Sequence, residues 1–470
     1  MSGPIDLEPR GGQQDTLALR LAAPVARTPR RHLADAATLL LRLPGQGPDE
    51  AAVSVLAAEL ADRVGPAVHP YEVAALLEAD GLSADMIRSR YGHPDIFSLA
   101  AALYERVPRV FPEPPATADP WRPDTVRCLL RGVLFALPAL AYLLTAPLWH
   151  PGRDAAPLVV GGIVSWAWGQ ALGHRAYLRM ATGPREAART LLCGAPLGAA
   201  LATAAAAVPA GGGPLTWAAA AQSLYLAAAG VLLVLGREWL LLAALGPVCA
   251  GAAALPWWEP GPWLRGGLPA LALLAVLGVA GWALRAGLAA EPAGQGGKPA
   301  LLRSLPYGLF GLAAAVLVLV EGRREPYAVV VLTLSMGPAE WLLYRFRGLA
   351  LAALGRSATP AGFLLRAAGV LSGCLLAYTL PLVLAGVLTG AGPAALPLLA
   401  ATLWTALLLQ AFGAAWPPAV LCLTAAAGAS AADLLGLAPG PAAVPGYCAA
   451  AALALAGCAL RLLGRPAPHT

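Results

Sequence analysis

Two polar pairs stand out in a chain that is otherwise strongly apolar. Gln170 and Arg175 are five positions apart, and Glu340 and Arg345 repeat that spacing 170 residues later. An amide or carboxylate beside a guanidinium can anchor a substrate, or form an ion pair that gates a passage between two halves of a transporter. The same residues could instead form local ion pairs at a membrane interface, with the arginines only setting the topology. The sequence leaves both interpretations open.

A second set of matches has a slightly larger shift. Gly236-Arg237-Glu238-Trp239 is matched by Gly413-Ala414-Ala415-Trp416, and Arg189 by Arg366, both 177 positions apart. The additional residues would fall in the loop just before Arg366. The matched residues occupy equivalent points of the predicted topology, which favours an internal duplication.

Three arginines, Arg131, Arg189 and Arg366, each stand at the start of an apolar stretch. If they face a central cavity, they could bind phosphate or pyrophosphate through bidentate hydrogen bonds. If they face outward, they would extend toward anionic lipid headgroups. Either position would suit an anionic amphiphile as ligand.

Few polar side chains lie within the apolar stretches themselves, among them Asp433, Gln222 and Gln410. Asp433 could titrate as a coupling site, as could Glu340, because a carboxylate in hydrocarbon is costly unless it is paired or protonated. Alternatively, Asp433 is a helix-end carboxylate in contact with interfacial water.

The sequence carries no signature of an enzyme or of a cofactor site. Lys298 follows two glycines but lacks the upstream glycine and the Ser/Thr of a phosphate-binding loop. His150 and His174 fall on opposite sides of the membrane in the predicted topology, so they cannot share a metal. The seven cysteines lie in apolar stretches without a Cys-x-x-Cys pair. We therefore expect a protein without catalytic residues, metal or cofactor.

Composition places most of the chain in a membrane. Of 470 residues, 58% are hydrophobic and 12% charged, and the mean hydropathy is +0.65. A soluble domain of this size could not bury the apolar surface of so many hydrophobic residues. Residues 1–125 hold 17 acidic and 12 basic residues, a net charge of −5, whereas residues 126–470 hold 9 and 20, a net charge of +11. This shift predicts a domain boundary near 120–124.

The apolar stretches predict an all-α protein with about twelve membrane-spanning helices, each close to the roughly 20 residues that cross a bilayer. The predicted spans are 128–149, 155–173, 189–208, 215–236, 239–257, 267–284, 304–320, 327–344, 363–388, 396–413, 416–436 and 443–463. Sixteen Lys and Arg residues then fall on the side of the N-terminus and four on the other. This bias predicts cytoplasmic N- and C-termini in a multi-pass protein of the plasma membrane.

Six spans on each side of a cytoplasmic loop at 286–303 give two parallel halves, 126–285 and 304–465, followed by a short tail at 466–470. Before them we expect a flexible arm at 1–31, a helical bundle at 32–109 and a proline-rich linker at 110–125. The first 30 residues contain no apolar segment typical of a signal peptide.

The predicted bundle begins its helices at Asp49, Ser83 and Asp95, and its core includes Leu77 and Met86. Residues 70–107 contain six acidic residues and three arginines. A surface that binds nucleic acid needs a concentration of positive charge, so DNA binding is disfavoured. A bundle that docks a cytoplasmic protein is the better interpretation.

Two transporter superfamilies have parallel six-helix halves. The loop Gly173-His174-Arg175-Ala176-Tyr177-Leu178-Arg179 lacks the aspartate and the second glycine of the major facilitator motif. Residues 126–470 instead resemble, in architecture, the multidrug/oligosaccharidyl-lipid/polysaccharide flippase superfamily. The resemblance implies export of a lipid-linked saccharide or another envelope amphiphile by alternating access, through a central cavity lined by Arg175, Arg345 or Glu340. The alternative is a non-transporting membrane protein whose N-terminal bundle docks or regulates an envelope-assembly complex.

Overall fold

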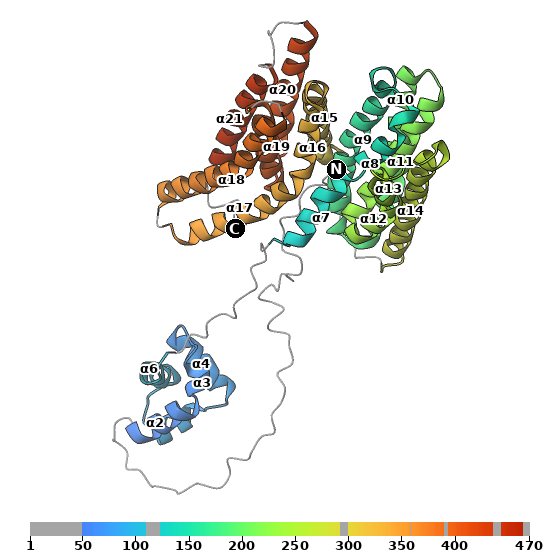
Figure 1. Ribbon diagram of the computed structural model, residues 1–470. Helices are drawn as coiled ribbons and strands as arrows, with labels where there is room; N and C mark the ends of the chain where they lie inside the picture. Colours follow the sequence, from blue (N-terminus) through green and yellow to red (C-terminus); the bar gives the residue numbers. More distant parts are fainter. Residues whose placement is uncertain are drawn as a thin grey trace. The chain divides into compact units, whose positions relative to one another are not determined.

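The computed structural model describes residues 49–109, 123–291, 299–357, 359–389, 393–435 and 443–463. Every regular element in these ranges is a helix. The chain divides into two compact units at Pro120 (Figure 1). The predicted arm at 1–31 and the tail at 466–470 lie outside the described residues, as do residues 32–48, most of the linker and Lys298.

The N-terminal unit is a small bundle of short helices. They are α2 (Glu50–Glu59), α3 (Ala61–Val64), α4 (Pro70–Ala79), α5 (Ala84–Tyr91) and α6 (Ile96–Arg106). Side chains of Asp49, Ser83 and Asp95 accept backbone N–H bonds at the starts of α2, α5 and α6, which confirms the three predicted caps. Leu77 is fully buried, but Met86 is 41% exposed, so its assignment to the core was wrong.

The second unit contains the apolar helices, which we divide into two groups by their order in the chain. The first group is α7 (Thr125–Ala136), α8 (Ala139–Thr145), η1 (Ala146–Leu148), α9 (Pro151–Met180), α10 (Pro184–Ala210), α11 (Pro214–Val234), α12 (Glu238–Ala244), α13 (Gly246–Ala254) and α14 (Pro262–Leu288). The second group is η2 (Leu301–Ser304), α15 (Leu305–Arg324), α16 (Pro326–Leu334), α17 (Met336–Gly355), α18 (Pro360–Thr389), α19 (Ala395–Ala411), α20 (Trp416–Leu435) and α21 (Ala443–Leu463).

Within the described ranges, nine helical segments are long and apolar enough to cross a membrane, and a tenth is the pair α16 and α17, bent by 42° at Ser335. All twelve predicted spans contain helix, but two are short. The predicted span at 239–257 is broken into α12 and α13 just before Pro247, and the one at 396–413 is the 17-residue helix α19. The chain is therefore a multi-pass membrane protein, while twelve spans in two parallel halves stay a prediction.

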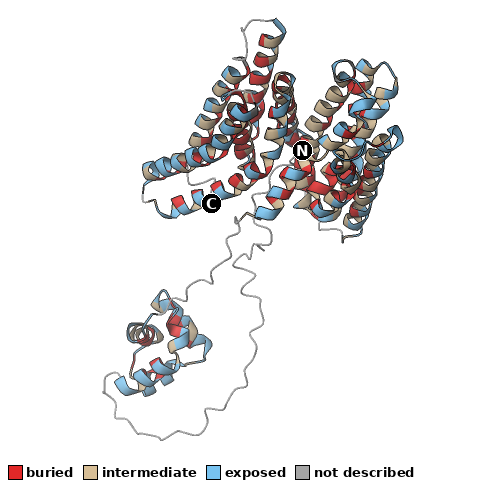
Figure 2. Ribbon diagram, in the orientation of Figure 1, coloured by how far each residue is buried: buried red, intermediate tan, exposed pale blue. Residues whose placement is uncertain are grey.

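Each group packs around its own apolar core. One core includes Leu191, Leu232 and Val276 of the first group, and the other includes Leu343 and Trp404 of the second. Leucines on α14 and α18, such as Leu274 and Leu365, are exposed, as expected of surfaces that contact lipid. Exposed residues recur along the outer helices of this unit (Figure 2).

The groups meet along three pairs of α-helices. Helix α9 packs against α15, and α7 packs against α16 and α17 while also contacting α12 (Figure 1). Helix α7 thus touches both groups, and the candidate site lies along it.

Candidate functional site

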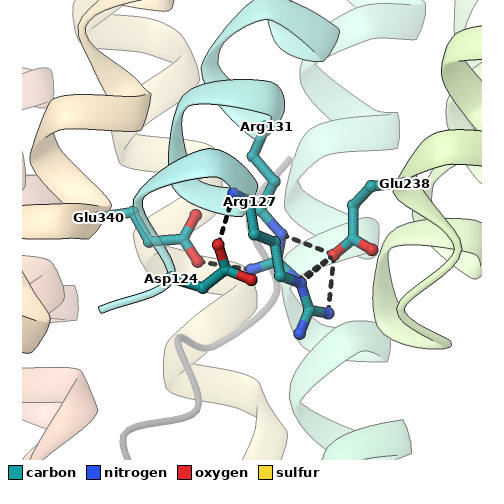
Figure 3. A network of polar contacts seen from close by, with 5 residues as sticks. All are labelled: Asp124, Arg127, Arg131, Glu238 and Glu340. Atoms are coloured by element: carbon teal, nitrogen blue, oxygen red, sulfur yellow. Dashed lines mark hydrogen bonds and ion pairs between the residues drawn. The ribbon is translucent and has the colours of Figure 1, made fainter. Parts of the chain in front are cut away.

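The site is centred on Arg131, a half-buried arginine of α7 that binds one carboxylate from each helix group (Figure 3). Its Nη1 donates to Glu340 Oε1 of α17 at 2.6 Å, and its Nε and Nη2 donate to Glu238 Oε1 of α12 at 3.0 and 2.8 Å. The Glu238 and Glu340 side chains are 4% and 6% exposed. Such buried charges persist only when they are paired, so Arg131 stabilises both carboxylates.

A second arginine, one helical turn earlier, completes the network. Arg127 Nε donates to the same Glu238 oxygen at 2.8 Å, and the Asp124 carboxylate caps α7 by accepting the Arg127 backbone N–H at 3.1 Å (Figure 3). Arg127 and Arg131 carry two positive charges and Glu238 and Glu340 carry two negative ones, so these four side chains are neutral together.

The close approach of α7 and α17 depends on two glycines. A Cβ on Gly132 would lie 2.9 Å from Gly337 N, and a Cβ on Gly337 would lie 2.8 Å from the Cys128 carbonyl oxygen. Contacts this short with backbone atoms leave no room for a methyl group. Gly132 follows Arg131 and Gly337 precedes Glu340 by three positions, so the glycine contact brings the two charged side chains within reach.

Glu340 also faces a cavity of about 90 Å³ between the two helix groups. Gln170 of α9 lines the same cavity, together with aromatic side chains that include Trp166, Phe310 and Trp404. Gln170 is 3% exposed as a whole residue, and its side-chain amide makes no hydrogen bond to another described residue. Because buried polar groups are normally bonded, this amide is available to a ligand or to water.

Helices α9 and α15 both contribute lining residues to the cavity and pack closely against each other. A Cβ on Gly311 would lie 2.8 Å from Gln170 Cγ, and one on Gly308 would lie 3.2 Å from Ala171 Cβ. One turn further, the His174 ring stacks on Tyr307 at 3.7 Å between ring centroids and hydrogen-bonds Ser304 Oγ at 3.1 Å. Small residues and one stacked pair therefore hold the two groups together here.

The other predicted site residues lie elsewhere. Arg175 donates to the Pro299 carbonyl at 3.3 Å, and Arg345 is exposed over the Trp341 ring. The structure thus brings Gln170 and Glu340 to one cavity but places neither matched arginine in it.

The remaining arginines and Asp433 form local contacts. Arg189 pairs with Glu186 one turn away on α10, and Arg366 donates to the Arg356 carbonyl. Asp433 forms an ion pair with Arg324 of α15 at 2.7 Å, so this carboxylate has a partner within the protein. Of the three arginines considered as phosphate ligands, only Arg131 pairs with carboxylates of both helix groups.

Sequence reasoning missed Glu238 and Arg127 as site residues, and it missed the buried Glu321 of α15. A usable signal was present, because residues 126–470 contain only nine acidic residues. Glu238 and Glu340 both border apolar segments, so each carboxylate needs a cation as partner. Arg127 and Arg131 lie one turn apart on a single helix and could pair with these two carboxylates.

The described residues contain no group of three or more His, Cys, Asp or Glu side chains arranged to hold a metal ion. The comparisons with known proteins found no matching family model, curated protein or solved structure.

Proposed function

We propose that this chain is a transporter of the flippase type, which moves an anionic amphiphile such as a lipid-linked saccharide across the cell membrane by alternating access. The observation that carries the proposal is the cavity between the helix groups, which Gln170 and Glu340 both line. An amide without a hydrogen-bond partner in the protein and a carboxylate thus line one small cavity, where a polar ligand could bond to the amide.

In this mechanism, the ion pairs of Arg131 are the contacts that change between the two states. Arg131 joins Glu238 of the first group to Glu340 of the second. If the groups rock against each other, the bond to Glu340 breaks while the bonds to Glu238 move with α7. The anionic headgroup of a substrate would then replace Glu340 as the partner of Arg131.

Flux of fluorescent short-chain lipids in proteoliposomes tests this proposal. A dithionite quench reports whether probes in the inner leaflet reach the outer one, and the probes are phosphatidylglycerol, phosphatidylcholine and an isoprenoid phosphate. We expect the full chain to move an anionic probe faster than empty liposomes do. We expect Gln170→Leu to reduce flux at least tenfold without loss of thermal stability, because it removes an unpartnered polar group.

The matched control is Gln222→Leu on α11, whose amide donates to the Leu158 carbonyl at 3.0 Å and which does not line this cavity. That variant should retain flux. Equal rates for folded wild-type protein and empty liposomes with all three probes would overturn the proposal, as would full flux in Gln170→Leu.

A second candidate function is suggested by the N-terminal unit, which has its own apolar core and could dock an envelope-assembly complex. Deletion of residues 1–120 distinguishes the two functions. A transporter should retain residual flux after the deletion, whereas a docking protein should lose all function in cells while its membrane helices stay folded.

A further inference from the structure

An open groove of about 980 Å³ lies between α17 and α18, away from the cavity described above. Three arginines line it. Arg345 lies on α17, Arg356 caps the C-terminal end of α17, and Arg366 lies on α18. The rest of the lining is apolar apart from Trp341 and glycines. A surface with exposed cations and apolar walls differs from the uniformly apolar surfaces that merely contact lipid.

The charge of this helix pair is not balanced by acidic residues. Residues 341–389 contain four arginines and no Asp or Glu. Within the ranges that the structure describes, no carboxylate forms an ion pair with Arg345, Arg356 or Arg366. The three guanidinium groups are exposed and therefore available to an anion from outside the chain.

The arginines are arranged along the groove rather than at one point. Arg366 donates to the Arg356 carbonyl oxygen, which holds these two residues together where α17 ends and α18 begins. Arg345 lies eleven positions before Arg356, or about 16 Å along a helix with a rise of about 1.5 Å per residue. It stacks over the Trp341 ring with 5.5 Å from Cζ to the ring centroid.

The space between these two ends is shaped by glycines. Gly369 and Gly373 lie one turn apart on α18 and line the groove, and a Cβ on either would meet no atom within 4 Å. Glycines that are not needed for close helix packing leave a channel here. The apolar lining of this channel suits a hydrocarbon chain.

We propose that this groove binds one anionic phospholipid, with its phosphate on Arg356 and Arg366 and an acyl chain along Gly369 and Gly373. Arginine suits this ligand because its planar fork can donate two hydrogen bonds to phosphate oxygens. The site goes beyond the proposed transport function, since it would operate in a transporter and in a docking protein alike.

Native mass spectrometry of the full chain in detergent tests the site. Phosphatidylglycerol and phosphatidylcholine with identical chains are titrated in parallel, with glycerol phosphate added as a competitor that has the headgroup but no chains. We expect at least tenfold tighter binding of the first phosphatidylglycerol than of phosphatidylcholine, and no competition by glycerol phosphate. Equal binding of the two lipids would overturn the proposal, and competition by glycerol phosphate would show an anion site without a lipid.

Two kinds of variant test separately how the charge of the groove and its shape contribute to lipid binding. The triple variant R345Q/R356Q/R366Q should lose at least tenfold in phosphatidylglycerol affinity, with R356Q/R366Q causing most of that loss. The matched control is R285Q/R303Q/R461Q, which removes three exposed arginines elsewhere. The same loss in this control would show a general charge effect and overturn the site.

The second variant, Gly369→Leu, fills the channel without changing the charge, and leucine is favoured in a helix. It should weaken binding of both lipids at the groove at least fivefold while leaving thermal stability unchanged. Because Arg366 also bonds the end of α17, loss of stability in R356Q/R366Q without any change in lipid preference would assign these arginines a purely structural role. That outcome, or unchanged binding in Gly369→Leu, contradicts the proposal.

Discussion

Arg131 and Glu340 are 209 positions apart in the sequence and form a 2.6 Å ion pair where α7 crosses α17. Arg131 bonds at the same time to Glu238 of α12, so a single guanidinium connects helices of both groups. A pair buried this deeply adds little net stability over an apolar pair of similar size, but it is expensive to break by removing one partner. It therefore fixes one arrangement of the helices and opposes others.

Arg131→Met should destabilise the folded membrane unit by about 3–5 kcal/mol, because it leaves Glu340 buried without a cation. SDS titration in mixed micelles, followed by tryptophan fluorescence, measures the change. The double variant Arg131→Met/Glu340→Met should regain most of the loss, since no unpaired charge remains between α7 and α17.

The matched control for this experiment is Arg189→Met. Arg189 pairs with Glu186 on the same helix, and its side chain is 54% exposed. An exposed pair within one helix contributes little, so the midpoint should not change measurably. If Arg131→Met behaved like Arg189→Met, the ion pair would not be a buried contact in the folded protein.

Gly337→Ala should also destabilise the crossing, by about 1–3 kcal/mol, because the added methyl group collides with the Cys128 carbonyl oxygen. Its control is Gly278→Ala on α14, where a Cβ meets no atom within 4 Å and the substitution should be neutral or slightly stabilising.

The effects of Gly337→Ala and Arg131→Met on stability should not be additive. Gly337→Ala combined with Arg131→Met should cost less than the sum of the single changes, because both disrupt the same contact. Strict additivity would contradict the link between the glycines and the ion pair.

The multi-pass helical architecture could be predicted from the sequence because the bilayer imposes a strong rule. Each span must satisfy its backbone hydrogen bonds internally and must be apolar over about 20 residues. The rule fails locally where proline interrupts an apolar segment, as at Leu245, where α12 ends and α13 begins with Gly246-Pro247. Hydropathy counts apolar residues and does not register that break.

The site could be predicted only in part. Spacing alone singled out Gln170 and Glu340, and these residues do line one cavity. The partner of Glu340 could not be predicted, because Arg131 and Arg345 are equally cationic and only tertiary packing selects between them. The selection depends on Gly132 and Gly337, whose importance appears only when α7 and α17 are seen to cross.

The N-terminal unit should fold by itself, because its helices share a core that contains Leu77 and Leu103, both fully buried. A fragment of residues 49–109 should show one cooperative urea transition by circular dichroism. Leu77→Ala should lower its free energy of unfolding by about 2–5 kcal/mol, a large loss for so small a domain. Val55→Ala, at a position 58% exposed, should change it by less than about 0.5 kcal/mol. A fragment without a cooperative transition would contradict this prediction.

Acid should destabilise the same unit through His93, which is 8% exposed. Burial, assisted by the charge of Arg106, lowers the pKa of His93 below its usual value of 6.5. The unfolded chain then binds a proton more readily than the folded one as the pH falls below 6.5, so the free energy of unfolding declines from that pH downward.

Urea titrations of the 49–109 fragment at pH 7.5, 6.5 and 5.5 measure this dependence on pH. His93→Gln should flatten the decline, because glutamine takes up no proton in this range. His69 is exposed and its Nδ1 accepts the Tyr71 N–H at the start of α4, so His69→Gln tests that cap separately and should retain the decline caused by His93. An equal decline in wild type and His93→Gln would assign the acid sensitivity to other groups, since the protonation of His93 would then have no effect on folding.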